Sequence, residues 1–147
     1  MLKLTEMNIP GYEKVIEARN EETGLHALFI IHSTQLGVAL GGLRIKHYDN
    51  NKDALTDGLR LAKAMSQKAA VAEVTYGGGK SIIMLAKNQK KSLRLLSSYA
   101  EALNTLNGSY LTAYDLGSSL EDIKEIQKSS QYTANTSPSI SNITASV

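Results

Sequence analysis

The most constraining feature of this sequence is one long amphipathic helix that lies between short apolar runs. The helix is predicted over Lys52–Ala69, because apolar residues recur there at the 3.6-residue period of an α-helix. These residues share one face: Leu55, Leu59, Ala62, Met65 and Ala69. An apolar helix face is stable only when another layer of secondary structure covers it, so the neighbouring runs are expected to form that layer.

The neighbouring runs predict strands, and with the helices they define the fold class. Tyr12–Asn20 and Leu25–His32 flank a turn that ends in Gly24, which is typical of a hairpin, and a Gly-rich loop is expected at Gly37–Gly42. The other expected elements are a strand at Leu43–His47, a strand at Ser81–Ala86, a helix at Leu93–Leu106, a strand at Tyr110–Tyr114, and a helix that Ser118 and Glu121 begin with capping-box spacing. Strands that alternate with helices predict an α/β fold in three layers, with a mixed or mostly parallel sheet flanked by helices.

The end of the chain differs in composition from the rest. Residues 129–147 are rich in Ser and Thr and show little periodicity. They are expected to form a loop or a disordered end. We therefore expect one folded domain over residues 1–132 and a Ser/Thr-rich tail over residues 133–147.

Composition and charge exclude several kinds of site. The chain has no Cys, which excludes a disulfide framework, thiolate metal ligands and a Cys nucleophile, and its three His show no zinc spacing. Sixteen Lys and Arg against 14 Asp and Glu leave a net charge of +2, so nucleic-acid binding has little support. No apolar run approaches the roughly 18 residues of a membrane span, and the N-terminus is not a signal peptide, so we expect a cytoplasmic protein without a membrane partner.

The segment Gly77–Ser81, Gly-Gly-Gly-Lys-Ser, is the first candidate site. A P-loop would need Gly at the position of Val74 and a helix after the lysine, whereas Ile82–Leu85 predicts a strand. Three consecutive glycines instead let the backbone approach a ligand or another segment closely. A tight turn that leaves Lys80 in solvent is the alternative.

Lys68, Lys80 and Asp115 are the other candidates for chemistry. A lysine that is partly desolvated, or that lies beside another cation, can act as a base near neutral pH, and a second lysine can bind a carboxylate. Asp115 follows an expected strand and precedes an expected helix, which is where α/β folds place ligand-binding groups. Taken singly, each is as compatible with a surface lysine or a turn aspartate.

Read in chain order, four segments resemble the N-terminal substrate and dimerisation domain of the Glu/Leu/Phe/Val dehydrogenase family, most closely its leucine dehydrogenases. Leu36–Arg44 is similar to Leu-Gly-Pro-Ala-Leu-Gly-Gly-x-Arg, and Leu59–Lys68 to Leu-Arg-Leu-Ala-Lys-Gly-Met-Thr-Tyr-Lys. Gly77–Lys80 matches the glycine-lysine motif of the family, and Thr112–Gly117 is similar to Thr-Ala-Glu-Asp-Val-Gly. The resemblance extends over about residues 11–132.

The resemblance implies reversible, NAD-dependent oxidative deamination of an L-amino acid. It implies that Lys80 is the general base that activates water, that Asp115 assists proton transfer and contacts the substrate amine, and that Lys68 binds the substrate α-carboxylate. The positions that shape the substrate pocket in the family correspond to Leu40, Gly41, Met65 and Ala113. An apolar Leu40 and a small Ala113 favour a branched aliphatic side chain over glutamate.

The sequence departs from the family pattern within the motifs and in the cofactor domain. Four residues differ from the motifs quoted above: Val38 stands for Pro, Leu43 for Thr, Gln67 for an aromatic residue and Tyr114 for Glu. Nothing in the chain matches the G-x-G-x-x-G of a Rossmann domain. A hydride acceptor would then have no place on the chain, so the chain alone is expected to show little or no turnover.

Two functions remain open. The first is a truncated branched-chain amino-acid dehydrogenase that keeps the substrate-binding half. The second is a non-catalytic module that oligomerises or binds an amino acid. A homo-oligomer is expected under both, because the resembling half of the family carries subunit contacts.

Overall fold

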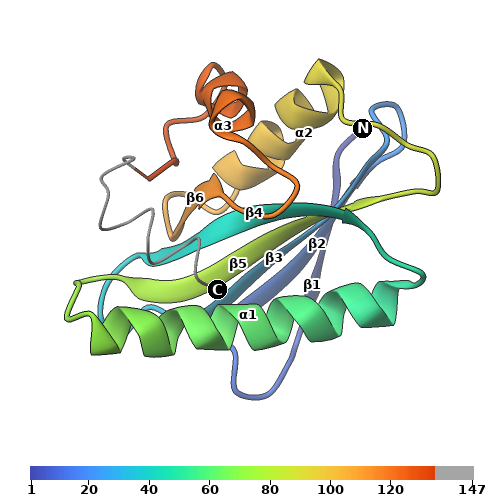
Figure 1. The fold of residues 1–147 in the computed structure, drawn as a ribbon. Helices are drawn as coiled ribbons and strands as arrows, with labels where there is room; N and C mark the ends of the chain where they lie inside the picture. The colour runs from blue at the N-terminus through green and yellow to red at the C-terminus, as the bar shows by residue number, and fades with distance from the viewer. Residues whose placement is uncertain (135–147) are drawn as a thin grey trace.

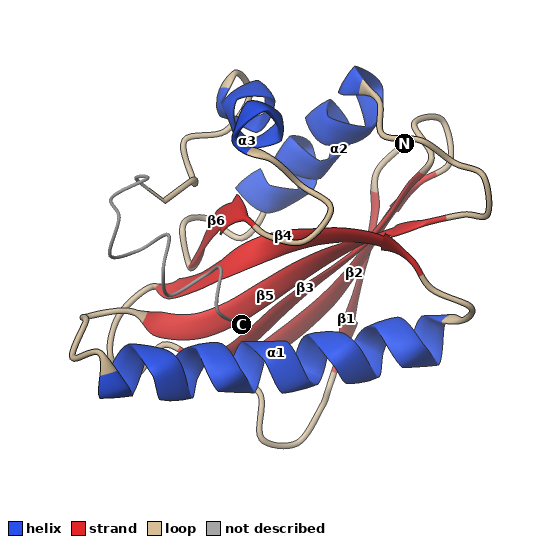
Figure 2. Cartoon of the chain, in the orientation of Figure 1, coloured by secondary structure: helices blue, strands red, loops and turns tan. Residues whose placement is uncertain are grey.

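The computed structural model describes residues 1–134, which form three layers with a sheet in the middle (Figures 1 and 2). Helix α1 covers one face of the six-stranded sheet, and α2 and α3 cover the other. The elements are β1 (Lys3–Met7), β2 (Lys14–Asn20), β3 (Leu25–Ser33), β4 (Ala39–His47), α1 (Asn51–Val71), β5 (Gly77–Leu85), α2 (Leu93–Asn104), β6 (Tyr110–Tyr114) and α3 (Leu120–Gln127). This architecture confirms the predicted α/β class, with a mixed sheet flanked by helices.

The connections through β4 and β5 explain why the helices lie on opposite faces. The strand order is β1-β2-β3-β5-β4-β6, with antiparallel pairs from β1 to β5 and with β4 parallel to both β5 and β6. The chain crosses the sheet in one direction through α1, from β4 to β5, and in the other direction through α2, from β5 to β6. Because such crossovers are right-handed, α1 and α2 are placed on opposite faces.

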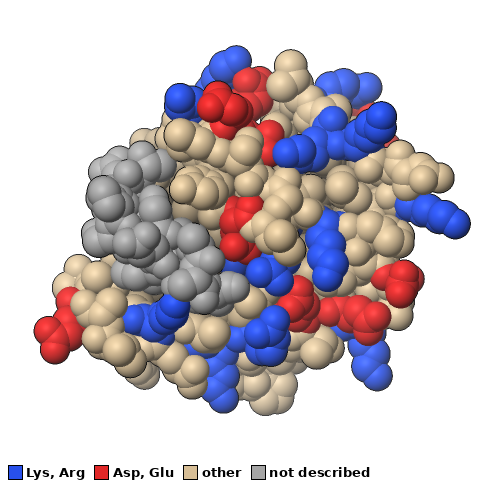
Figure 3. Space-filling view, viewed as in Figure 1, with Lys and Arg blue, Asp and Glu red and all other residues tan. Residues whose placement is uncertain are grey.

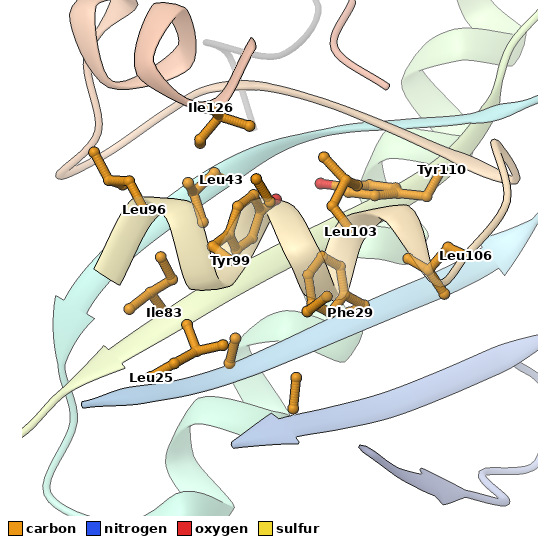
Figure 4. Close-up of a cluster of buried hydrophobic side chains, with 14 of the residues drawn as sticks. Leu25, Phe29, Leu43, Ile83, Leu96, Tyr99, Leu103, Leu106, Tyr110 and Ile126 are labelled. Atoms are coloured by element: carbon orange, nitrogen blue, oxygen red, sulfur yellow. The ribbon is translucent and has the colours of Figure 1, made fainter. Parts of the chain in front are cut away.

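Alternation along the strands divides the core between the two faces. On the α1 face, Leu28, Ile30 and Ile82 pack with Ala54 and Ala62 of the helix. The opposite face packs against α2 and α3 through a larger cluster, drawn in Figure 4, that includes Phe29, Leu43, Ile83, Tyr99, Leu103 and Ile126. Adjacent residues of one strand therefore belong to different layers.

The glycine segments lie within strands, which corrects the loop expected at Gly37–Gly42. Strand β4 already includes Gly41, and β5 begins with the run Gly77–Gly79. A Cβ on Gly41 would overlap the carbonyl group of Gly79. A glycine run is typical of a loop in sequence, but here it permits a backbone approach that any other residue would block.

Helix α3 begins one residue later than the predicted cap. Ser119 is the N-cap: the Asp122 N–H donates to its Oγ at 3.2 Å, and its own N–H donates to Asp122 Oδ2 at 2.9 Å. The predicted pair, Ser118 and Glu121, has the same spacing, but Ser118 binds the preceding loop instead. Two adjacent serines make the start of such a helix ambiguous in sequence.

Two segments add to the predicted elements. Strand β1 pairs with β2 at the edge of the sheet. Beyond α3, the Ala134 N–H donates to the Thr112 carbonyl at 2.8 Å, and the Thr112 N–H donates to the Tyr132 carbonyl at 3.1 Å. Residues up to Ala134 therefore pack against β6, and the rest of the expected tail lies outside the described residues.

Two surface features bear on the expected partners. Within residues 1–134, no helix has the length and apolar character needed to cross a membrane. On the face drawn in Figure 3, Lys and Arg are interspersed with Asp and Glu and do not form one basic patch. That face therefore offers no continuous positive surface of the kind that binds nucleic acid.

Candidate active site

The candidate residues come together on the α1 face of the sheet. Strand alternation places Leu40 of β4 and Ala113 of β6 on this face, where both contact Met65 of α1. Lys80 of β5 lies two residues before Ile82, which packs against the same helix, so Lys80 points toward the same face. These residues come from three adjacent strands and one helix, and the β-α-β connection brings them together.

A buried ion pair lies at the centre of the site. Lys80 Nζ is 2.8 Å from Asp115 Oδ2, and the side chains are 0% and 6% exposed. This distance defines a salt bridge, and the Lys80 ammonium has no acceptor besides Asp115 in the described part of the chain. An ammonium has three donors, so Lys80 keeps donors that a water molecule or a substrate could use.

Burial changes the proton affinity of Lys80. Desolvation lowers the pKa of Lys80 below the usual 10.5, and the positive charge of Arg44 lowers it further. The carboxylates of Asp115 and Asp57 oppose this change but do not cancel it. A lysine in this state releases its proton more readily than a surface lysine, as a general base requires.

Local backbone features hold Asp115 beside Lys80. Gly42 lacks the Cβ that would collide with the Asp115 side chain. The Asp115 N–H donates to Ser118 Oγ at 2.9 Å, and that hydroxyl donates to the Leu43 carbonyl of β4 at 2.6 Å. The loop after β6 is thereby tied to β4, and the carboxylate faces β5.

Two further charged residues surround Asp115, Arg44 and Asp57, and neither was among the predicted site residues. Arg44 Nε donates to Asp115 Oδ2 and Arg44 Nη1 donates to Asp57 Oδ2, each at 3.2 Å. Asp57, on α1, also accepts from Tyr48 OH at 2.6 Å and from Arg60 Nη2 at 2.9 Å. Arg44 lay within a quoted motif and could have been singled out; nothing in the sequence distinguished Asp57 from an exposed helix residue.

The expected pocket residues form a small apolar cluster next to the ion pair. Leu40, Met65 and Ala113 are buried together with Ala134, and partly buried apolar side chains surround them: Val74, Tyr76 and Leu111. Gly41 contributes backbone only, and its carbonyl accepts a hydrogen bond from Tyr110 OH at 2.6 Å. The cluster is apolar on the sides that the structure describes.

Lys68 and Tyr114 have contrasting positions. Lys68 is half-buried on α1, three residues after Met65, and so lies on the same side of the helix one turn further along. Tyr114 packs into the cluster of the α2 and α3 face. The family substitution beside Asp115 therefore places its side chain on the face opposite the ion pair.

The glycine run Gly77–Gly79 is packed inside the domain and is not a phosphate-binding loop. The run Gly77–Gly79 is part of β5, and Cβ atoms there would collide with Ser33, Ser66 and Tyr110, so its glycines serve internal packing rather than phosphate binding. No group of three potential metal ligands occurs within residues 1–134.

The fold and the buried lysine–aspartate pair define an α/β domain with a buried charged site, and comparison with known proteins identifies its family. The Glu/Leu/Phe/Val dehydrogenase dimerisation domain matches residues 12–132. The chain therefore belongs to the Glu/Leu/Phe/Val dehydrogenase family.

Individual relatives agree with this assignment. The chain is 38% identical to leucine dehydrogenase of Bacillus subtilis over 127 residues, 86% of this chain and 35% of that protein. It is 39% identical to valine dehydrogenase of Streptomyces albus over 128 residues, 87% of this chain and 35% of that protein. The crystal structure of L-tryptophan dehydrogenase from Nostoc punctiforme is similar with a TM-score of 0.79 and 36% identity, covering 84% of this chain and 36% of that one.

The similarity has a limited extent. The chain spans about a third of the length of these relatives. A hetero-hexameric glutamate dehydrogenase from Thermus thermophilus shares the fold, with a TM-score of 0.63 at 22% identity, 88% coverage of this chain and 30% of that one. The comparisons thus define the domain, and its activity is a separate question.

Proposed function

We propose that this chain is the amino-acid-binding and acid–base domain of an NAD-dependent dehydrogenase for branched aliphatic L-amino acids. The buried Lys80–Asp115 pair, 2.8 Å apart, is the observation that carries this proposal. NAD, as hydride acceptor, is implied by the family resemblance, and a second domain would have to hold it. The cytoplasmic location expected from the sequence stays a prediction.

Lys80 and Asp115 would divide the proton transfers between them. A neutral Lys80 Nζ takes a proton from the water whose oxygen attacks the imino carbon of the oxidised substrate. Asp115 contacts the substrate nitrogen and relays to it the proton that Lys80 has taken from the water. Lys80 then accepts the proton of the new hydroxyl group as the carbon–nitrogen bond breaks and ammonia leaves. The lowered pKa of Lys80 supports the first role, since burial disfavours its charged form.

The neighbouring residues would select the substrate. Lys68 would bind the α-carboxylate, and the cluster of Leu40, Met65 and Ala113 would contact the side chain. A substrate carboxylate placed against this apolar cluster would lose its hydration without a partner, so glutamate is disfavoured. A branched aliphatic side chain would bury only carbon there.

Titration of the isotope-labelled chain with amino acids, followed by NMR, tests the binding role. L-Leucine should cause saturable shifts at Ala113 and Leu40, whereas D-leucine and L-glutamate should not. Lys68→Met should weaken L-leucine binding at least about tenfold, because a charge-assisted contact is lost. Lys63→Met, which removes an exposed lysine from the same helix, is the matched control. Absence of binding to the folded chain would refute the proposal.

Two further measurements separate the catalytic reading from a non-catalytic module. The purified chain should not reduce NAD with L-leucine, and turnover at an ordinary enzymatic rate would contradict a separate cofactor domain. Self-association, which we also propose, is measured by light scattering. An oligomer that binds no amino acid would instead support a purely structural module.

A further inference from the structure

The Asp115 carboxylate is shared by two cations from two different strands. Its Oδ2 atom lies 2.8 Å from Lys80 Nζ on β5 and 3.2 Å from Arg44 Nε on β4. All three side chains are largely removed from solvent, with Arg44 12% exposed. A site that needed only an ion pair would have no use for the second cation.

The second cation solves a problem that the proposed chemistry creates. When Lys80 gives up its proton, Asp115 loses the charge of its nearest partner. A buried carboxylate without a compensating charge is costly, so the loss would hold the proton on Lys80. A guanidinium stays protonated throughout, and it can compensate Asp115 whichever state Lys80 is in.

We propose that Arg44 is a positioning residue that keeps Asp115 charge-compensated while Lys80 exchanges its proton. This inference rests on the proposed function, because it gives Lys80 a cycle of proton loss and gain. Arg44 acts through Asp115 and through its charge, without contacting the substrate.

Asp57 holds Arg44 in the orientation that this role needs. It binds Nη1 of the guanidinium at 3.2 Å, and Tyr48 and Arg60 fix the carboxylate from both oxygens. Burial alone would lower the pKa of Arg44, but Asp115 and Asp57 together raise it above its usual value. The charged groups that act on Lys80 are therefore Asp115 from the β6 loop, Arg44 from β4 and Asp57 from α1.

The experiment measures the protonation of Lys80 directly, by the pH dependence of its 13Cε and 15Nζ NMR signals. Lys80→Met identifies the signal by its loss. Arg44→Gln should raise the pKa of Lys80 by about one unit or more, because a nearby like charge is removed. Arg44→Lys keeps a cation and should restore most of the original pKa. Lys46→Gln removes an exposed cation from the same strand and should leave it unchanged.

A second variant keeps the test decisive if Arg44→Gln fails to fold. Asp57→Asn leaves the Arg44 charge but removes the carboxylate that opposes it, so the pKa of Lys80 should fall. Shifts of opposite sign in the two variants support the proposal. No shift in a folded variant, or a rise in Asp57→Asn, overturns it. No substrate is used, so this result is independent of whether the chain binds L-leucine.

Discussion

At Gly41 the backbone of β4 lies directly against that of β5. A Cβ at this position would overlap the carbonyl of Gly79 and approach the Lys80 N–H. A Cβ there would force β4 and β5 apart, because the atoms that it meets belong to the backbone and not to a flexible side chain. The residue expected to shape the substrate pocket thus also sets the spacing of the strands that carry Leu40 and Lys80.

Gly41→Ala should therefore reduce the free energy of unfolding by at least about 3 kcal/mol, or prevent folding. Urea denaturation followed by circular dichroism measures the change. Leu36→Ala, in the exposed loop before β4, is the control and should stay within about 0.5 kcal/mol of the original. A stable Gly41→Ala chain would show that the strands have room to separate.

Helix α3 is short, and its stability depends on its N-cap and on two buried side chains. Ile123 and Ile126 are its buried residues, and eight residues are too few for a helix to be stable without such packing and a cap. Ser119→Ala should cost about 1 kcal/mol, because the Asp122 N–H loses its acceptor. Ser97→Ala, at an exposed position within α2, removes a hydroxyl without a capping role and should cost nothing measurable. Equal unfolding curves for the two variants would contradict the assigned cap.

The elements found from sequence and those missed differ in how local their signal is. The face of α1 and the apolar run of β3 are periodic within a few residues, so their patterns predicted them. Strand β1 is mostly exposed, and the run Gly77–Gly79 at the start of β5 has no side chains. Neither segment therefore shows the alternation of apolar and polar residues that predicts a strand. The contact between Arg44 and Asp57 depends on how α1 packs on β4, which no local pattern encodes.

At the scale of the whole molecule, the sheet separates the charged site from a buried hydroxyl cluster. Lys80 points toward α1, while Ser81, the next residue, points toward α2. There Ser81 Oγ lies 2.7 Å from Tyr99 OH and 2.9 Å from Tyr110 OH, and Tyr99 donates to Thr112 at 2.9 Å. Figure 4 shows the oxygen ends of the two tyrosines directed toward each other. The cluster joins α2, β5 and β6 directly behind the site.

The hydroxyl cluster makes the stability of the molecule sensitive to high pH. Burial raises the pKa of Tyr99 from 10.0 to about 12 and that of Tyr110 well above 10.0. Above pH 10 the unfolded chain loses these protons first, so the stabilisation present below pH 10 declines as the pH rises. For Tyr99 alone, a pKa raised from 10.0 to about 12 corresponds to roughly 3 kcal/mol. Lys80 has the opposite effect, and at lower pH. Because its pKa is lower in the folded chain than in the unfolded chain, the free energy of unfolding increases as the pH rises toward 10.5.

Unfolding free energies of the original chain and of Tyr99→Phe, measured by urea denaturation at pH 9 and pH 11.5, test this account. At pH 9 the variant should be less stable by about 1–3 kcal/mol, because the hydroxyl groups of Ser81 and Thr112 lose a buried partner. Between the two pH values it should lose less stability than the original chain, since one titrating group is gone. If both proteins lose the same free energy of unfolding between the two pH values, the pKa of Tyr99 does not differ between the folded and unfolded chains. The sensitivity to base would then arise from other residues.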